Sequence, residues 1–168
     1  MLGAGCLARV GSDGCGWEQA LEAALRAVEQ SDEGGANEGF IREDGFLFIL
    51  VISDEDDCSV AGDPWSEEIF DPTRLDLGNA GTRCVLHADR LVDVGETIEM
   101  LHGLKGNPER LLLAFVAGVP EGPICEGLGD VIPGCLEHPD MQQVVSADGS
   151  SIENACSSSI GSGQPGRA

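Results

Sequence analysis

The chain has 168 residues, with 30 acidic side chains against nine basic ones and a formal net charge of -21 at pH 7. Nucleic acids and anionic membrane surfaces bind to basic protein surfaces, so this charge argues against both as partners. No apolar run approaches the roughly 20 residues of a membrane span, and the 42% hydrophobic content is ordinary for a globular protein.

Seven cysteines are spread along the chain without a Cys-x-x-Cys pair, a distribution that favours disulfides over a zinc site. Disulfides indicate an exported protein in the periplasm, at the cell surface or outside the cell. The first residues do not form a secretory signal, so we expect the signal peptide to lie outside this chain. Proximity in sequence favours the pairs Cys6–Cys15 and Cys58–Cys84, and it leaves three cysteines open: Cys125, Cys135 and Cys156.

The first predicted element is a helix over residues 17–30. Apolar side chains recur there at helical spacing, at Trp17, Leu21, Leu25 and Val28, and a Gly-Gly pair follows. Residues 1–16 are rich in turn-forming residues. The sequence therefore predicts a turn-rich start that leads into an amphipathic helix.

The next element is a strand over residues 46–53, whose seven apolar residues run directly into Ser53 and four consecutive acids. An unbroken apolar run predicts a strand buried on both faces, in the middle of a parallel sheet. Ligand sites in such sheets lie beyond the carboxyl ends of the strands. The four acids are Asp54, Glu55, Asp56 and Asp57.

These acids have two interpretations, which the run alone leaves evenly balanced. Four adjacent carboxylates repel one another, and a hard divalent cation would relieve the repulsion. The alternative is a solvated acidic turn. Arg42 is the one base nearby in sequence; it is either a surface residue or a brace for a site carboxylate.

The sequence predicts a long connection over residues 58–89, which a Cys58–Cys84 disulfide would hold together. Trp65 is expected to pack over apolar surface. A second helix is expected over residues 88–104 and a second buried strand over residues 111–119. Two such strands joined through a helix are expected to be parallel neighbours. The expected fold of residues 1–120 is α/β, in the order helix, strand, helix, strand, with parallel strands. Residues 121–168 form an irregular Gly-, Ser- and Cys-containing extension whose last dozen residues are expected to be disordered.

Two segments resemble a known family when they are taken together. The segment Gly14-Cys15-Gly16-Trp17-Glu18-Gln19 opens the first helix, and the segment Asp54-Glu55-Asp56-Asp57-Cys58-Ser59 ends the first strand. Both are similar to segments of von Willebrand factor type A (vWA) domains, and most similar to those of the cysteine-containing vWA-like proteins of myxobacteria. The resemblance covers residues 5–119, and it implies an α/β fold whose doubly wound, mostly parallel sheet is incomplete in this chain.

The resemblance implies a metal-ion-dependent adhesion site that holds Mg²⁺, or Ca²⁺ or Mn²⁺ in its place. It implies that Asp54 reaches the metal, with Ser53 as the hydroxyl before it. The family's Asp-x-Ser-x-Ser loop is missing from this chain, which therefore looks like a fragment of a longer domain, and Cys15 stands where the family has a metal-binding Thr. Ser12 is the substitute hydroxyl. We therefore expect a partial site with weak or absent metal binding, and Glu55, Asp56, Asp57 and Arg42 facing the ligand or supporting the site.

The predicted function is noncatalytic binding of a protein or cell-surface ligand by an adhesion-type domain. One alternative is a metal-dependent hydrolase in which Asp54, Asp56 and Asp57 hold the cation. It needs a base that activates a nucleophile, and no motif supplies one. The other alternative is a structural, disulfide-tied acidic surface module.

Overall fold

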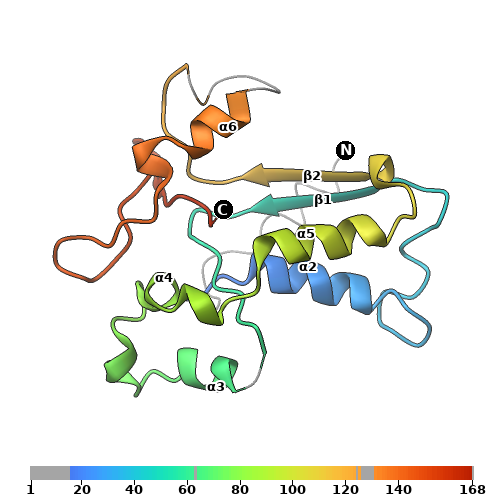
Figure 1. Ribbon diagram of the computed structural model, residues 1–168, viewed down its shortest axis with the longest axis horizontal. Coiled ribbons are helices and arrows are strands. Elements are labelled where there is room, and N and C mark those ends of the chain that lie inside the picture. Colours follow the sequence, from blue (N-terminus) through green and yellow to red (C-terminus); the bar gives the residue numbers. More distant parts are fainter. Residues whose placement is uncertain (1–15, 63, 124, 126–130, 168) are drawn as a thin grey trace.

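The computed structural model describes residues 16–62, 64–123, 125 and 131–167 (Figure 1). Over these residues the protein is a mixed α/β structure with one parallel and one antiparallel two-stranded sheet. The parallel sheet consists of β1 (Leu47–Ile52) and β2 (Leu111–Val116). Helices α2 (Ala20–Glu29) and α5 (Val94–Gly103) contact each other and lie along this sheet. The other elements are α3 (Trp65–Ile69), η1 (Leu75–Leu77), α4 (Arg83–Leu86), η2 (Ala88–Arg90), η3 (Pro108–Arg110), α6 (Val131–Leu136), η4 (Pro139–Met141), β3 (Cys156–Ser157) and β4 (Ser162–Gly163).

The predicted order of helix, strand, helix and strand is confirmed, and so is the parallel pairing. The register places Leu47 opposite Leu111 and Ile52 opposite Val116. The helix predicted over residues 88–104 is two separate elements in the structure, η2 and α5. They are separate because α5 begins after its N-cap residue, Asp93. The Asp93 carboxylate accepts a hydrogen bond of 2.8 Å from the backbone N–H of Glu96. No helix in the described ranges is both long and apolar enough to cross a membrane.

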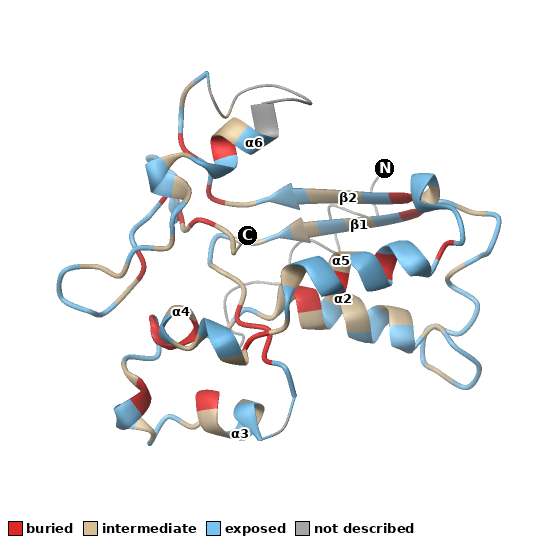
Figure 2. Cartoon of the chain, in the orientation of Figure 1, coloured by how far each residue is buried: buried red, intermediate tan, exposed pale blue. Residues whose placement is uncertain are grey.

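One face of the parallel sheet forms the main core. Leu47 of β1 and Leu111 of β2 are buried against Leu101 of α5. Leu25 and Val28, which share the apolar side of α2, pack against the same cluster. Leu25 and Val28 therefore face the sheet, as the helical spacing predicts, and α2 lies alongside α5 (Figure 2).

The expectation that residues 111–119 form a buried strand is wrong, since Leu112 and Val116 of β2 are 52% and 57% exposed. The expectation that β1 is buried on both faces is wrong as well. Its side chains alternate: Phe48 and Ile52 are 58% and 56% exposed, whereas Leu47 is buried. Successive side chains of a strand point to opposite faces, and among the described elements α2 and α5 cover only one of them. The apolar run correctly predicted that both faces are apolar, but it carries no information about what covers the second face.

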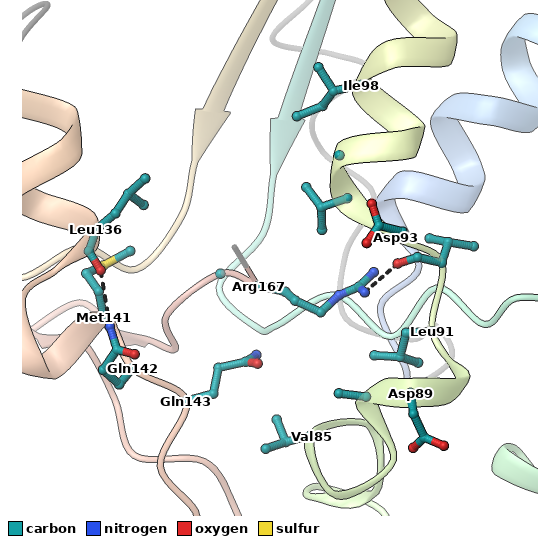
Figure 3. A pocket seen from close by; sticks show the side chains of 15 residues that line it. Val85, Asp89, Leu91, Asp93, Ile98, Leu136, Met141, Gln142, Gln143 and Arg167 are labelled. Atoms are coloured by element: carbon teal, nitrogen blue, oxygen red, sulfur yellow. Dashed lines mark hydrogen bonds between the residues drawn. The ribbon is translucent and has the colours of Figure 1, made fainter.

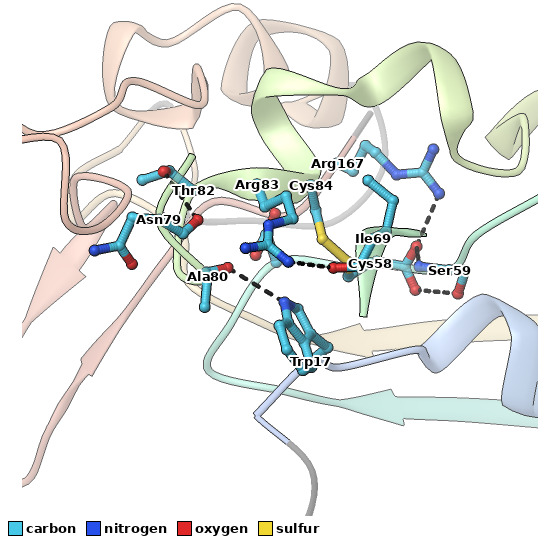
Figure 4. The surroundings of a disulfide bond; sticks show 12 residues. Trp17, Cys58, Ser59, Ile69, Asn79, Ala80, Thr82, Arg83, Cys84 and Arg167 are labelled. Carbon is cyan, nitrogen blue, oxygen red and sulfur yellow. Dashed lines mark hydrogen bonds and ion pairs between the residues drawn. A yellow bond between two sulfur atoms is a disulfide. The ribbon is translucent and has the colours of Figure 1, made fainter. Parts of the chain in front are cut away.

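A second, smaller core surrounds the disulfide between Cys58 and Cys84, a pairing that the sequence predicted (Figure 4). Ile69 packs there, and the guanidinium of the buried Arg83 donates to the carbonyl oxygens of Ile69 and Asp71 at 2.8 Å each. The same guanidinium also donates to two further loop carbonyls. The long connection is therefore organised by one disulfide and one buried arginine.

The two tryptophans, Trp17 and Trp65, lie at the rim of this long connection. The sequence predicts that Trp65 packs over apolar surface. The residue is 37% exposed, and its ring lies 4.4 Å from the Arg90 guanidinium carbon, which is a cation–π contact. Trp17 packs on Phe70, with ring centroids 5.5 Å apart, and its indole N–H donates to the carbonyl of Ala80. Trp17 therefore joins the start of α2 to this smaller core.

The C-terminal segment lies against the parallel sheet, whereas we expected its last dozen residues to be disordered. Pro165 forms a parallel bridge to Gly118, directly after β2, and Gly163 and Pro165 are buried. A disulfide joins Cys125 to Cys135, and Cys156 forms no disulfide with a described cysteine. The Gly- and Ser-rich composition suggested disorder. In the structure, Gly118 and Gly163 have no side chains, and this allows their backbones to approach each other closely.

Candidate binding site at the carboxyl end of the parallel sheet

The acidic loop after β1 is anchored on the first turn of α2. The backbone N–H of Cys58 donates to the Glu18 carbonyl at 2.6 Å. In return, the N–H of Leu21 donates to the Asp57 carboxylate at 3.0 Å, and the N–H of Glu22 donates to the Ser59 hydroxyl at 2.9 Å. Gln19 at the start of α2 makes no side-chain cap. The loop therefore caps α2 from outside, where the helix dipole favours a negative charge.

Asp57 is the most fully paired acid of the four. One carboxylate oxygen accepts from Leu21 N and from the Ser59 hydroxyl at 2.7 Å. The other accepts from Ser59 N at 3.1 Å and from the Arg167 guanidinium at 2.8 Å. The Asp57 and Arg167 side chains are each only 12% exposed, and Arg167 also donates to the carbonyl of Val92. The positive charge that the acids require is therefore supplied by an arginine of the same chain (Figure 4).

Asp56 is held from the C-terminal segment. Its carboxylate accepts from the Gln143 side-chain amide at 3.2 Å, and its backbone N–H donates to the Gln164 side chain at 3.3 Å. Burial raises the pKa of the Asp56 carboxyl to about 6, and the neighbouring Asp57 and Glu55 charges act in the same direction. Below about pH 6 the repulsion among the four acids is therefore partly relieved, because Asp56 then carries a proton.

Asp54 and Glu55 are the two acids that face solvent. The Ser53 hydroxyl accepts from the Glu55 N–H at 3.2 Å and donates to the Glu55 carbonyl at 3.0 Å, so Ser53 closes a tight turn. The Asp54 carbonyl accepts from the backbone N–H of Gln164 at 2.9 Å. Burial, followed by the Glu18 and Asp54 charges, raises the pKa of the Glu55 carboxyl. The turn holds its backbone in place and leaves two carboxylates available to a partner.

Asp57 and Ser53 are poorly available to the expected divalent cation, whereas the Asp54 carboxylate is exposed. Mg²⁺ requires near-octahedral oxygen ligands, but the oxygens of Asp57 already accept four hydrogen bonds and the Ser53 hydroxyl is engaged in its turn. Within the part of the chain that the structure describes, no group of three or more His, Cys, Asp or Glu side chains is arranged to hold a metal ion. Ser12 and the Cys6–Cys15 pairing lie outside the described residues.

Arg42 does not brace these carboxylates in the structure. It precedes β1, at the opposite end of the strand, and its carbonyl accepts from the Lys105 ammonium group. Arg167 has the bracing role instead, although it is 110 residues from Asp57 in sequence. No local pattern could have identified Arg167, Gln143 or Gln164, because each reaches the loop only after the C-terminal segment has packed.

A cavity of about 920 Å³ lies beside this loop, between the start of α5 and the segment around Met141 (Figure 3). Its lining mixes apolar side chains such as Leu91 and Ile98 with Asp89, Asp93 and Arg167. The Arg167 guanidinium is already bonded to Asp57 and Val92. The cavity therefore does not offer Arg167 as a free cation for an anionic ligand.

Comparisons with models of known protein families, with characterised proteins and with solved structures find no match to this chain.

Proposed function

We propose that the chain is a noncatalytic, exported binding module of the vWA-like kind, which binds a protein or cell-surface ligand at the carboxyl end of its parallel sheet. One observation carries the proposal: the two segments on which the vWA resemblance rests contact each other. The backbone N–H of Cys58 in the second segment donates to the Glu18 carbonyl of the first segment. The N–H of Leu21, in the helix that the first segment opens, donates to Asp57. In the same proposal, β1 and β2 belong to a doubly wound sheet of which α2 and α5 form one helical layer.

Binding in this proposal does not use a metal ion. The resemblance itself implies weak or absent metal binding, because the family's Asp-x-Ser-x-Ser loop is missing from this chain. The pairing of Asp57 with Arg167 and with the first turn of α2 supports the same proposal. The exposed Asp54 and Glu55 are then direct acceptors for cationic groups of a ligand. The expected ligand surface therefore presents Lys or Arg side chains, in keeping with the chain's net charge of -21.

The test is selection of ligands from a displayed library of random peptides, using the intact disulfide-bonded chain. Counter-selection uses the double variant Asp54→Asn/Glu55→Gln, which keeps the shape of the turn and removes two charges. We expect peptides rich in Lys and Arg that bind the natural chain at least about tenfold more tightly than the variant. Enriched peptides that bind both proteins equally would place the ligand elsewhere, and hydrolysis of generic ester or phosphoester substrates by the natural chain would contradict a noncatalytic role.

A further inference from the structure

The second face of the parallel sheet is an apolar surface that no described element covers. We call it the open sheet face. Phe48 lies beside Leu112 in the register, and Ile52 beside Val116. The exposed fractions of its five large side chains lie between 45% and 58%. The open sheet face consists of Phe48, Leu50, Ile52, Leu112, Ala114 and Val116.

This surface differs from ordinary exposed apolar residues in its continuity. Single apolar side chains on a surface are common, whereas a contiguous apolar patch marks an interaction site. Parallel strands are found almost only in sheets that are covered on both faces. The open sheet face therefore has the apolar side chains that are typical of a sheet face covered by another element.

The shape of the covered face indicates what fits on the open one. Two helices of ten residues each, α2 and α5, cover the inner face with apolar side chains at helical spacing. A six-residue strand spans roughly 20 Å, which a helix of about 13 residues matches in length. One amphipathic helix laid along the strands would cover the open sheet face.

The charged side chains around the open sheet face indicate which kind of helix can dock on it. Six acids against two bases, Arg42 and Arg110, lie within the short segments that flank the strands (residues 42–46, 53–55, 107–110 and 117–121). A second copy of the chain would bring another net charge of -21 to the same place, and like charges oppose that pairing. A helix with basic side chains beside its apolar stripe is complementary. The six acids are Glu43, Asp44, Asp54, Glu55, Glu109 and Glu121.

We propose that the open sheet face is the docking surface for a cationic amphipathic helix of a partner protein, which packs along β1 and β2 opposite α2 and α5. The apolar side chains of the open sheet face lie outside the acidic loop of the proposed function, whose Asp54 and Glu55 stand at one edge of the surface, and the proposal does not depend on the vWA resemblance. Apolar contacts with Phe48 and its neighbours hold the helix, and the acids at the strand ends select a basic one.

The experiment measures fluorescence anisotropy of labelled model peptides during titration with the intact disulfide-bonded chain. The probe is a 14-residue Leu/Lys peptide with leucines at positions i, i+3, i+4 and i+7. One control peptide has the same composition in scrambled order, and a second has Glu in place of Lys. The protein variants are Phe48→Glu, on the open sheet face, and Ile160→Glu, which changes a 97% exposed apolar residue between β3 and β4.

We expect the Leu/Lys peptide to bind at least tenfold more tightly than either control peptide. Phe48→Glu should weaken its binding at least tenfold, and Ile160→Glu should leave it unchanged. Circular dichroism of both variants establishes that they are folded, and Leu112→Glu replaces Phe48→Glu if the latter is unfolded. Equal binding of the scrambled peptide, or binding that is insensitive to changes in the open sheet face, would overturn the proposal. A concentration-dependent dimer that Phe48→Glu converts to monomer would also overturn it, because a second copy would then be the occupant.

Discussion

At the scale of single residues, the acidic loop shows how four adjacent carboxylates are accommodated in different ways. Asp57 is paired with Arg167 and with the first turn of α2, and Asp56 is partly buried beside Gln143. Asp54 and Glu55 are the more exposed of the four, although burial and the Glu18 and Asp54 charges raise the pKa of the Glu55 carboxyl. Like charges can therefore be adjacent in sequence because each has a different environment in the fold.

The Asp57–Arg167 pair predicts a large effect of Asp57→Asn on stability. The substitution removes the negative charge and leaves the mostly buried Arg167 guanidinium without its ion partner. Breaking a mostly buried, hydrogen-bonded charge pair costs about 2–4 kcal/mol in the free energy of unfolding. Urea denaturation at neutral pH with the disulfides intact measures this loss.

The matched control is Asp54→Asn, in the same loop, because the Asp54 side chain is exposed. Its free energy of unfolding should differ from that of the natural chain by no more than about 0.5 kcal/mol. Equal losses in the two variants would mean that the Asp57–Arg167 pair has no special role.

Asp56 predicts a dependence of stability on pH. Its folded-state pKa of about 6 is above the ordinary value of 3.8, so between these pH values the folded chain holds a proton that the unfolded chain has released. The contribution of Asp56 to the free energy of unfolding is therefore greatest below about pH 4 and is lost as pH rises to 6. Asp56→Asn should resemble the natural chain at pH 4 and be the more stable of the two at pH 7. Denaturation curves across this range measure the difference, and a difference independent of pH would contradict the assignment.

At the scale of elements, α5 is fixed to the sheet by one side of the helix. Leu101 is 3% exposed and packs against Leu47 and Leu111, whereas the adjacent Met100 is 54% exposed. Adjacent helical positions point about 100° apart, so one contacts the core and the other contacts water. These two neighbours form a matched pair for measuring how strongly the helix is held.

Leu101→Ala should lower the free energy of unfolding by about 2–4 kcal/mol, because it removes buried methyl groups and leaves a cavity between α5 and the sheet. Met100→Ala should change it by less than about 0.5 kcal/mol. Chemical denaturation of both variants gives the comparison. Similar values for the two would show that α5 does not pack on β1 and β2 as described.

The Cys58–Cys84 disulfide connects the acidic loop to α4 across 26 residues. Closing a loop of that length in the unfolded chain contributes about 3 kcal/mol to stability. Replacing both cysteines with Ala should therefore lower the free energy of unfolding by at least that amount, because both side chains are also buried. The Cys125→Ala/Cys135→Ala variant, whose loop spans ten residues, should lose less. A larger loss in the Cys125→Ala/Cys135→Ala variant would contradict the conclusion that the Cys58–Cys84 disulfide contributes more to stability.

At the scale of the whole molecule, local patterns in the sequence predicted the fold better than the site. Helical spacing predicted α2, and apolar runs predicted β1 and β2, because the burial of one stripe or strand is encoded in adjacent residues. The pairing of Cys58 with Cys84 also followed from their positions at the ends of one connection. The exposure of the second sheet face could not be predicted, since it depends on which elements cover it.

The candidate site was only half predictable for the same reason. The position of the acids at the end of β1 could be read from the sequence, but their separate roles could not. Those roles depend on Gln143, Gln164 and Arg167, which reach the loop through long-range packing. A run of acids indicates that charge must be compensated, and it does not say whether a metal ion or an arginine compensates it.

The most direct measurement is an isothermal titration of the intact chain with Mg²⁺ and Mn²⁺, together with amide NMR spectra of the acidic loop. Because Arg167 already compensates Asp57, we predict no saturable binding at millimolar metal and no selective change at Asp54, Glu55, Asp56 or Asp57. Saturable binding that shifts or broadens these amide signals, and that Asp54→Asn abolishes, would contradict the account.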